Sequence, residues 1–254
     1  MIQHRRRAEI VRRLRCSGPM SAAALAGSLG VSASTIRRDL AELSRQGTLT
    51  RVHGGAHAEA DADVDMPFAN VAAIAPEDKD AVAGCALELV NDGDVLLLDI
   101  GTTVAHLARR LRGRRVTVLT SSLAVLDELR ADECVELLVL GGLVRRTYHS
   151  LVGALTEDAL RQVRADRAFI GASGVHGDGQ VLDSTLVETP IKRAMIAAAG
   201  QVVLLADKGK FPGTGALRVC GVDELDVLVT NAGADSATLD TCSAAGVEVM
   251  LACD

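Results

Sequence analysis

Residues 31–55 read V-S-A-S-T-I-R-R-D-L-A-E-L-S-R-Q-G-T-L-T-R-V-H-G-G, and this stretch decides the fold of the first part of the chain. Ile36, Leu40 and Leu43 recur at the spacing of one helix face and are expected to pack inward. Small hydroxyls and paired arginines then occupy the free face of the first two turns. Arginine can donate two hydrogen bonds to a guanine edge, and a hydroxyl can reach a phosphate or a base edge. The pattern predicts a DNA-contacting helix whose contact residues are Ser32, Ser34, Thr35, Arg37 and Arg38.

Two shorter helical patterns precede this helix. Apolar residues at helical spacing predict one helix over 6–15, and Leu25 and Leu29 share one side of a second helix that starts at Ser21. Gly30 then provides a turn. Two helices, a glycine turn and a third helix are typical of the helix-turn-helix, in which the last helix enters the major groove.

A short basic hairpin follows the third helix. Residues 49–52 and the His53-Gly54-Gly55 turn predict a strand pair, a wing that lays Arg51 and His53 along the DNA backbone or in the minor groove. A small helical domain with a solvated basic face is the plain alternative. We favour DNA binding because the apolar spacing, the turn, the paired arginines and the wing agree with one another.

The charge is divided unequally along the 254 residues. Residues 1–57 contain ten arginines, no lysine and three acidic residues, a net charge of +7, whereas the remainder carries 17 basic and 30 acidic side chains, a net charge of −13. A basic segment attracts nucleic acid through counterion release, and an acidic one discourages non-specific wrapping. We therefore expect a DNA-binding domain over 1–57, a linker over 58–76 and a second domain over 77–254, which suits the length.

No pattern for export, membrane insertion or metal binding stands out. The Q-H-R-R-R start cannot serve as the apolar core of a signal peptide, and no apolar segment reaches the roughly 20 residues of a membrane span. We expect a cytoplasmic protein that does not enter the membrane. The cysteines are dispersed, without C-x-x-C or histidines at zinc spacing, and predict small core residues rather than metal ligands. They are Cys16, Cys85, Cys134, Cys220, Cys242 and Cys253.

From residue 77 the chain alternates helical patterns with short unbroken runs of Val, Leu and Ile. The preceding residues 57–75, rich in Ala and Asp, are expected to form the linker and a first extended segment. The apolar runs predict parallel strands buried on both faces, hence a Rossmann-like α/β sheet. Strands are expected over 95–100, 116–120, 135–140, 167–171, 201–206, 226–230 and 247–252. Helices are expected over 77–91, 103–112, 123–130, 156–164, 186–199 and 237–245.

Polar residues follow several of these strands, where an open α/β sheet binds its ligands. The G-T-T turn at 101–103 offers free backbone N–H groups and two hydroxyls to an anion. Asp99 would repel a phosphate at contact distance and is better suited to sugar hydroxyls, with Lys208 or Lys210 as the countercharge. These positions predict a phosphosugar pocket. The expected pocket residues are Asp99, Gly101, Thr102, Thr103, Ser121, Ser122, Gly141, Gly142, Asp207, Lys208 and Lys210.

Each part of this pocket also has an ordinary interpretation. Gly-Thr-Thr after a strand is often only a helix start with a hydroxyl cap, and residues 207–210 can form a surface turn. Glu188 and Lys192 are further candidates for the pocket, but two such residues four apart on one helix are often a solvent-exposed ion pair. Taken together at the strand ends, the set favours a phosphosugar pocket.

Several motifs are similar to those of DeoR-type bacterial transcriptional regulators. T-I-R-R-D-L (35–40) and R-V-H-G-G-A (51–56) resemble the winged helix-turn-helix of that family, and the likeness continues to the C-terminus. The resemblance implies a sensor domain related in fold to ribose-5-phosphate isomerase, which binds phosphorylated sugars or related metabolites. The further motifs are L-D-I-G-T-T (98–103), L-G-G (140–142), E-T-P-I-K (188–192) and A-D-K-G-K-F (206–211).

Two stretches depart from the family's pattern. Thr120-Ser121-Ser122 stands where Thr-Asn-Ser is usual, which changes the hydrogen bonds offered to a ligand. Residues 207–210 read Asp-Lys-Gly-Lys where Asp-x-Ser-Lys is frequent, which removes a hydroxyl near the expected phosphate and adds a charge. The resemblance is therefore least informative about the identity of the effector.

The sequence favours a repressor of a carbohydrate-metabolism operon that is relieved by a phosphorylated sugar. Its partners are expected to be operator double-stranded DNA and further copies of the chain, in a homodimer or homotetramer, because one small head buries too little surface for tight specific binding. The alternative is a sugar-phosphate isomerase-like enzyme with a DNA-binding head, in which Glu188 is the base and a lysine the electrophile.

The motifs of known enzyme classes are missing from the sequence. It has no Ser-His-Asp order, H-E-x-x-H, Walker A or complete G-x-G-x-x-G, so we expect no catalytic residue, no metal and no cofactor. A structural nucleoid protein, which needs an overall positive charge, is excluded by the net charge of −6.

Overall fold

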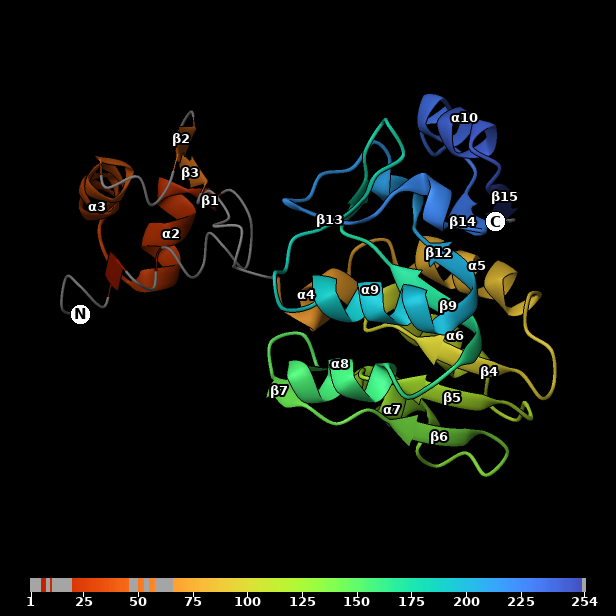
Figure 1. Ribbon diagram of the computed structural model, residues 1–254. Helices are drawn as coiled ribbons and strands as arrows, with labels where there is room; N and C mark the ends of the chain where they lie inside the picture. The colour runs from red at the N-terminus through yellow and green to blue at the C-terminus, as the bar shows by residue number, and fades with distance from the viewer. Residues whose placement is uncertain are drawn as a thin grey trace. The chain divides into compact units, whose positions relative to one another are not determined.

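The computed structural model describes residues 6–7, 10, 20–45, 50–52, 55–57 and 66–252 (Figure 1). The chain divides into two compact units, Met1–Pro67 and Phe68–Asp254, which we call the head and the body. The buried apolar residues of the head form one cluster of their own, and those of the body form two. Each unit therefore has its own hydrophobic core.

Of the two longer helices described in the head, α2 has the expected ends. Helix α2 spans Ala22–Leu29, and the Ser21 hydroxyl caps it by accepting a hydrogen bond from the Ala24 backbone N–H (3.1 Å). Gly30 ends α2 in a left-handed conformation (φ 64°), which glycine adopts without strain. Helix α3, the expected DNA-contacting helix, spans Ala33–Arg45.

The apolar face predicted for α3 is buried. Ile36, Leu40 and Leu43 pack in one cluster with Leu25 of α2 and with Ile10. Of the helix expected over 6–15, the described residues at 6, 7 and 10 are helical, and the other positions lie outside the described residues. The head therefore has the predicted helix-turn-helix arrangement of α2, a glycine turn and α3.

The wing consists of two short antiparallel strands, β2 (Thr50–Val52) and β3 (Gly55–His57). A third strand, β1 (Met20–Ser21), pairs with β3 and was not expected, since two residues carry no alternation pattern. For Arg51 only the strand is described, and His53 and Gly54 lie outside the described residues.

The body begins with a helix inside the stretch expected to be linker. Helix α4 spans Phe68–Ala72, and its first backbone N–H donates to the Thr147 carbonyl (2.9 Å). Helix α5 (Pro76–Leu87) follows, with a proline in its first turn. The expected extended segment is thus helical over 68–72. Five residues are too few to show a helical period, and α4 is held by contacts with residues far along the chain.

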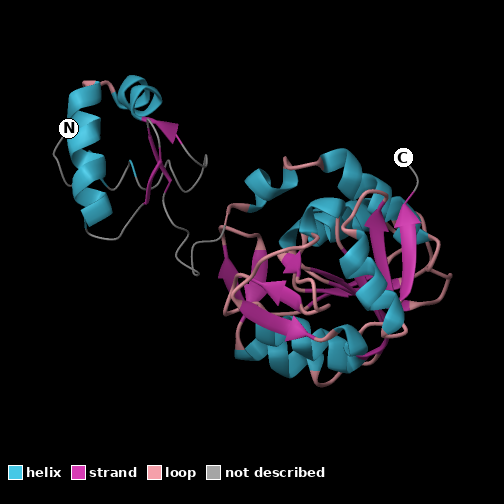
Figure 2. Cartoon of the chain, turned by 90° about the horizontal axis from the view of Figure 1, so that it is seen from above, coloured by secondary structure: helices cyan, strands magenta, loops and turns pink. Residues whose placement is uncertain are grey.

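Seven parallel strands form the central sheet of the body, in the order β15-β14-β12-β9-β4-β5-β6. Each of the seven expected strands corresponds to one of them. Figure 2 shows the strands between two layers of helices. The strands are β4 (Val95–Leu98), β5 (Thr117–Thr120), β6 (Glu136–Val139), β9 (Ala165–Gly171), β12 (Ala199–Leu205), β14 (Val227–Asn231) and β15 (Glu248–Ala252).

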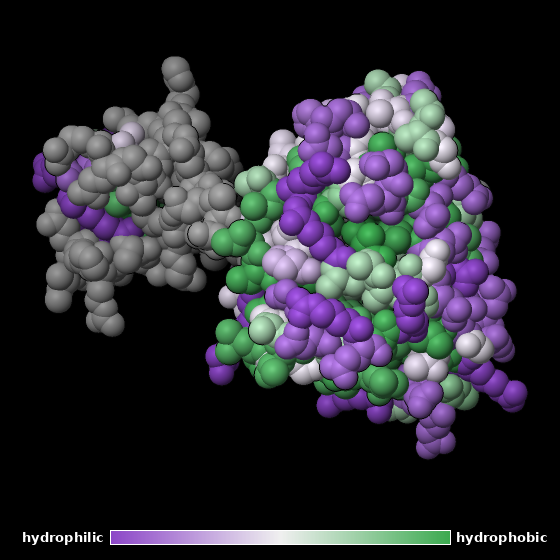
Figure 3. All heavy atoms as spheres, in the orientation of Figure 1, coloured by the Kyte–Doolittle hydropathy of each residue, from purple (hydrophilic) through white to green (hydrophobic). Residues whose placement is uncertain are grey.

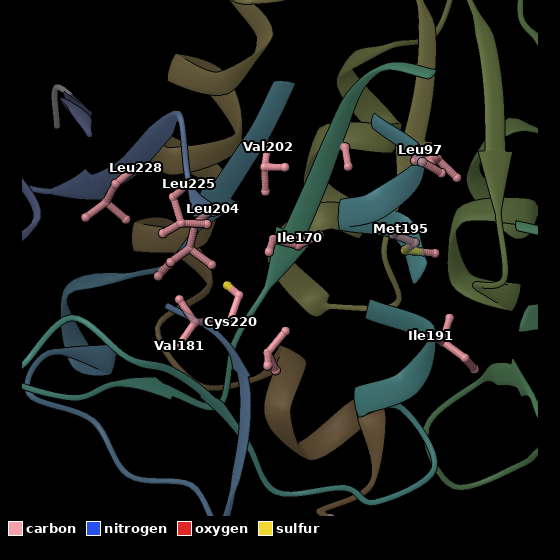
Figure 4. Packing of buried hydrophobic residues seen from close by; sticks show 14 of the residues in the cluster. Leu97, Ile170, Val181, Ile191, Met195, Val202, Leu204, Cys220, Leu225 and Leu228 are labelled. Carbon is pink, nitrogen blue, oxygen red and sulfur yellow. The ribbon is translucent and has the colours of Figure 1, made fainter. Parts of the chain in front are cut away.

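Alternate residues of the strands face the two helical layers. Leu97 and Ile170 belong to the cluster that includes Met195, and this cluster is drawn in Figure 4. Leu96 and Leu98, their neighbours on β4, belong to the cluster on the other face. The first cluster is covered by α8 (Ala154–Leu160), α9 (Thr189–Ala198) and α10 (Ser236–Ala244), and the second by α5, α6 (Thr102–Arg110) and α7 (Leu123–Leu129).

Several small elements of the body were not predicted. Strands β7 (Leu143–Arg145) and β8 (Ser150–Val152) form a separate hairpin. Strands β10 (Gly174–Val175), β11 (Val181–Asp183) and β13 (Leu217–Cys220) form a separate three-stranded sheet. Strands of two or three residues are too short for an apolar pattern to reveal them, and an arginine interrupts the apolar residues of β13.

The cysteine prediction is only partly correct. Cys220 and Cys242 are buried, and burial raises the pKa of both thiols, that of Cys220 to about 12. Cys134 is exposed and is not a core residue. Cys16 and Cys253 lie outside the described residues. None of the helices in the described ranges combines the length and the apolar character that crossing a bilayer requires.

Candidate functional site

The expected DNA-contacting residues lie at the beginning of α3. Ser32, Ser34, Arg37 and Arg38 are exposed, and Thr35 is half-buried. The Ser32 hydroxyl accepts from the Thr35 backbone N–H (3.2 Å) and lies 2.9 and 2.8 Å from the hydroxyls of Ser34 and Thr35. Ser32 therefore caps the helix, and the two arginines one turn later extend from a fixed helix start.

A buried carboxylate of α3 ties the helix to the N-terminal segment. Asp39 is 1% exposed, and its two oxygens accept from the Arg6 Nε (2.6 Å) and the Arg7 Nε (3.1 Å). In the sequence these arginines are visible only as part of the basic charge. Two of the ten arginines of residues 1–57 therefore have a structural partner, and the acidic residue of the T-I-R-R-D-L motif is the one that holds them.

In the body, three ionic groups lie close together at the carboxyl end of the sheet. Asp99, directly after β4, is 1% exposed and forms an ion pair with Lys192 of α9. The same Asp99 oxygen accepts from the Gly171 backbone N–H (2.9 Å), and the Lys192 Nζ donates to the Gly171 carbonyl (3.0 Å). The Asp183 Oδ2 lies 3.5 Å from the Lys192 Nζ. Elements 93 residues apart in sequence are thereby joined at the carboxyl end of the sheet.

Lys192 keeps its charge in this buried position. Burial by itself lowers the pKa of Lys192, but the carboxylates of Asp99 and Asp183 outweigh burial, so the pKa lies above its ordinary value. A charge of this kind is tolerated in a protein interior only when it is paired and hydrogen-bonded, as it is here. Lys192 therefore places a fixed positive charge beside Asp99.

Glu188 lies at the start of α9 and is also buried. It forms an ion pair with Arg145 of β7 and accepts a hydrogen bond from the Ser150 hydroxyl of β8 (2.9 Å). Burial raises the pKa of Glu188, and Arg145 and Lys192 only partly counteract this. A solvent-exposed Glu188–Lys192 pair, the ordinary interpretation, is wrong, because both side chains are buried and pair with other elements.

The G-T-T turn begins α6, as expected. Gly101 is the N-cap residue and provides no side-chain cap, and Thr102 and Thr103 in the first turn are both buried. The next loop differs, since the Ser122 hydroxyl caps α7 by accepting from the Val125 backbone N–H (3.2 Å). The hydroxyl-cap interpretation thus applies to Ser122 and not to the G-T-T turn.

The two glycines after β6 have a packing role. The Gly141 carbonyl accepts from the Thr156 hydroxyl (2.6 Å). A Cβ added to Gly142 would lie 2.3 Å from the Thr156 Oγ1 and 2.8 Å from the Val152 carbonyl oxygen. Only glycine fits there, because the loop passes directly against β8 and α8.

Residues 207–210 form a second polar cluster at the carboxyl end of β12. Asp207 caps a 3-10 turn, η1 (Lys208–Lys210), by accepting from the Gly209 backbone N–H (3.0 Å). Lys208 pairs with Asp78 of α5 (3.0 Å), while Asn231 of β14 accepts from the Lys208 backbone N–H (3.1 Å). Lys210 is half-buried. Of the two expected countercharges, Lys208 therefore has a carboxylate partner within the body.

Three buried polar atoms have no hydrogen-bond partner among the described residues. They are the Asp99 Oδ1, the Ser121 Oγ and the Thr230 Oγ1. Asp99 directly follows β4, Ser121 directly follows β5, and Thr230 is the last residue but one of β14. All three lie at the carboxyl ends of strands of the parallel sheet.

Several residues around the expected pocket carried no recognised signal in the sequence. Arg145 and Ser150 lie on the unpredicted hairpin, and Asp183 lies on the unpredicted small sheet. Asp78 and Asn231 contact the 207–210 turn, with the Asn231 Nδ2 donating to the Asp78 carbonyl (3.0 Å). Asn231 at a strand end was the one available signal, by the rule that also selected Asp99.

The helix-turn-helix head carries an exposed basic helix, and the α/β body has buried polar groups at the carboxyl end of its sheet. These two features together are typical of ligand-responsive DNA-binding transcriptional regulators. Two family models match the chain, the DeoR-like helix-turn-helix domain over residues 6–61 and the DeoR C terminal sensor domain over residues 74–232. The chain belongs to the DeoR family of transcriptional regulators. The resemblance seen in the sequence is thereby confirmed.

Two named relatives agree with this assignment. The chain is 33% identical over 230 residues to the transcriptional repressor AccR of Agrobacterium fabrum, covering 90% of this chain and 89% of the relative. It is 31% identical over 233 residues to the glycerol-3-phosphate regulon repressor of Escherichia coli, covering 91% and 92%. Both are named repressors and not enzymes, which favours the regulator over the isomerase alternative.

Among solved structures, ribose 5-phosphate isomerase A of Methanocaldococcus jannaschii is similar with a TM-score of 0.40 and 22% identity, over 53% of this chain and 54% of that one. The fold class predicted from the sequence, a small winged helix-turn-helix head followed by a mostly parallel α/β body, is confirmed.

Proposed function

We propose that this regulator represses a carbohydrate-metabolism operon and that a phosphorylated sugar, bound in the body, relieves repression. The two relatives described above are named repressors, one of them of the glycerol-3-phosphate regulon. The protein acts where chromosomal DNA is, in the cytoplasm. Within the head unit, residues 1–57 form the DNA-binding domain and a linker lies within 58–67, and the sensor body starts at α4.

The observation that carries the proposal is the group of three buried polar atoms at the carboxyl end of the sheet. Buried polar atoms are nearly always hydrogen-bonded, so a group of unpaired ones calls for an explanation. Two of them, the Asp99 Oδ1 and the Ser121 Oγ, follow neighbouring strands at the edge where open α/β sheets bind ligands. A sugar with several hydroxyls supplies the donors and acceptors that these atoms lack.

The phosphate would bind next to the sugar, at the start of α6. The first backbone N–H groups of a helix have no partner within the helix, and the helix dipole favours an anion there. Thr102 and Thr103 add two hydroxyls. Lys210 is the better countercharge, because Lys208 already pairs with Asp78. Asp99 would then bind sugar hydroxyls, and Lys192 would keep its carboxylate in place.

In the head, Arg37 and Arg38 would contact bases or phosphates in the major groove, with Ser32, Ser34 and Thr35 beside them. Arg51 and His53 of the wing would contact the backbone or the minor groove. Successive residues of a helix are rotated by about 100°, so the two arginines of α3 cannot contact bases equally. We assign one of them to base recognition and the other to positioning.

Self-association through the body would bring two heads to one operator. Exposed apolar side chains lie on β7 and at the start of α8, where Leu143 is 74% and Leu155 is 72% exposed. Apolar residues are visible over this part of the body surface in Figure 3. Paired helix-turn-helix heads bind two half-sites, so a homodimer or homotetramer fits this proposal. Light scattering of the full chain measures the oligomeric state.

The effector proposal is tested on operator DNA. The operator is first selected from a random duplex library with the unmodified chain, and its binding is followed by fluorescence anisotropy. Glycerol 3-phosphate, glucose 6-phosphate and fructose 1-phosphate are compared with glycerol, glucose and fructose. We expect one phosphorylated compound, and not its parent, to weaken operator binding by about 5- to 150-fold.

A pocket variant makes the test specific. The double variant Thr102→Ala, Lys210→Ala should bind the operator normally and respond to no compound, while Thr241→Ala on α10 should respond like the unmodified chain. A response to the parent sugar alone, or an undiminished response of the double variant, would end the phosphate-pocket proposal and leave the family assignment intact.

A further inference from the structure

Helix α4 is the place where the chain passes from the head into the body. The head ends at Pro67, and Phe68, the first residue of α4, already donates its backbone N–H to the Thr147 carbonyl of the body (2.9 Å). The helix has no buried residue of its own. Its attachment to the body therefore depends on a few specific contacts, which lead in two directions.

The first set of contacts leads to Glu188. The Phe68 ring meets the Tyr148 ring edge-on (5.7 Å between centroids) and stacks on the His149 ring (5.5 Å). The Arg145 guanidinium lies over the Tyr148 ring (5.4 Å) and forms an ion pair with Glu188. The β7–β8 hairpin thus connects α4 to the start of α9.

The β7–β8 hairpin contains a strained backbone conformation at His149. His149 has a φ of 52°, a left-handed conformation that is costly for a residue other than glycine. The next residue, Ser150, donates its hydroxyl to Glu188 (2.9 Å), and the His149 carbonyl accepts from the Leu123 backbone N–H at the start of α7 (2.8 Å). The loop before α7 and the β7–β8 hairpin therefore contact each other at His149, the residue whose ring stacks on the Phe68 ring.

The second set of contacts leads to Lys79, a buried amine within electrostatic range of Asp207 and Lys210. Lys79 of α5 is 1% exposed, and its Nζ donates to the carbonyls of Val71 (2.5 Å) and Ile74 (2.7 Å) at the end of α4. Burial lowers the pKa of Lys79; nearby Asp207 raises it and Lys210 lowers it further. The end of α4 is thus held by the hydrogen bonds of a buried amine, and the charges of Asp207 and Lys210 act on that amine.

We propose that α4 transmits occupancy of the effector pocket to the head, with Phe68 and Lys79 as positioning residues that fasten it to the two sides of that pocket. This inference rests on the proposed function. An anion bound near the start of α6 lies next to the Asp99–Lys192 pair, and the charge of Lys192 acts on Glu188, the partner of Arg145. The anion also adds negative charge beside Lys210. Both changes reach groups that hold α4, and α4 is covalently continuous with the linker to the head.

The test uses two variants of the full chain and one matched control. Phe68→Ala removes the ring contacts, Lys79→Met removes the donated hydrogen bonds at nearly constant volume, and Ile74→Ala shortens a side chain of the same segment that is 53% exposed. All are titrated with selected operator, with and without the active compound of the sugar phosphate panel, and ligand binding is measured by calorimetry.

The two variants are expected to bind operator alone and compound alone within about threefold of the unmodified chain, while the roughly 5- to 150-fold effect of the compound on operator binding falls below about twofold. Ile74→Ala should keep the full effect. A full effect in Phe68→Ala and Lys79→Met would overturn the inference while the proposed function stands. An unmodified chain that binds operator but no phosphorylated compound would overturn both.

Hydrogen exchange of the unmodified chain covers the case in which a variant does not fold. The compound should change the exchange of the backbone amides of residues 68–75 by several-fold and leave those of α10 (Ser236–Ala244) unchanged. Unchanged exchange at 68–75 in a chain saturated with the compound would contradict the role of α4.

Discussion

The head and the body place their candidate functional groups in opposite environments. In the head, Arg37 and Arg38 extend from α3 into solvent, where a phosphate or base can reach them. In the body, Asp99, Glu188 and Lys192 are buried and paired across different elements. A substitution on the head's exposed face should therefore change binding without changing stability. A substitution among the buried groups of the body should change both.

The largest expected effect is the loss of Lys192. Lys192→Met leaves the carboxylates of Asp99 and Asp183 buried together without their cation, and removing one partner of a buried ion pair costs about 3–5 kcal/mol. Tyr148 is the only tyrosine and the chain has no tryptophan, so tyrosine fluorescence reports on the body. Urea unfolding followed by this signal gives the free energy of unfolding, and a loss under about 1 kcal/mol would show that the buried triad does not stabilise the body.

Asp39 is a buried ionic group among the described residues of the head, and the stability of the head should be less sensitive to its loss. Asp39→Asn leaves Arg6 and Arg7 without a carboxylate, but their side chains are 14% and 23% exposed and can partly turn to water. Charged hydrogen bonds contribute about 1.5–3 kcal/mol, so we expect a loss of that size in the head alone. Circular dichroism should show an earlier head transition while Tyr148 fluorescence stays unchanged. A shift in both signals would mean that the units do not unfold separately.

The exposed arginines should affect binding alone. One of Arg37→Ala and Arg38→Ala should cost about 1–3 kcal/mol on the selected operator and little on random DNA. Arg51→Ala should weaken both and reduce the salt slope by about one unit. Stability should stay within about 0.5 kcal/mol for all three. Equal small losses of operator binding in the three variants would remove the major-groove assignment of α3.

The smallest effect concerns pH. The pKa of Glu188 is raised above its ordinary 4.5, so over the window between the two values the folded chain retains a proton that the unfolded chain has lost. The contribution of Glu188 to stability is therefore complete below pH 4.5 and is lost as the pH rises through the raised pKa. Relative to Glu188→Gln, the unmodified chain should lose stability across this window, as measured by urea midpoints. The opposite slope would mean that Arg145 keeps Glu188 ionised.

Much of this contrast was predictable from local sequence patterns. The spacing of Ile36 and Leu40 identified the buried face of α3, and the apolar runs identified all seven parallel strands. The rule that ligands bind after strands selected Asp99 and Ser121, two of the three residues with unpaired buried atoms.

The partners of these residues were not predictable, because they depend on contacts between distant segments. Nothing in the short β7–β8 hairpin indicated that Arg145 and Ser150 would reach Glu188. Helix α4 is too short to show a period and is defined only by its contacts. Lys79 carried no signal in the sequence, yet it is buried and donates to the carbonyls at the end of α4.

We propose that the expected effector pocket of the body and the exposed helix α3 of the head are coupled. Coupling between two binding sites is reciprocal, so the operator must weaken effector binding by the factor by which the effector weakens operator binding. The most direct measurement is calorimetric titration of the full chain with the active sugar phosphate, alone and on saturating operator DNA. The account predicts an affinity about 5- to 150-fold lower on the operator, equal to the factor found by anisotropy. The same affinity with and without operator would contradict it.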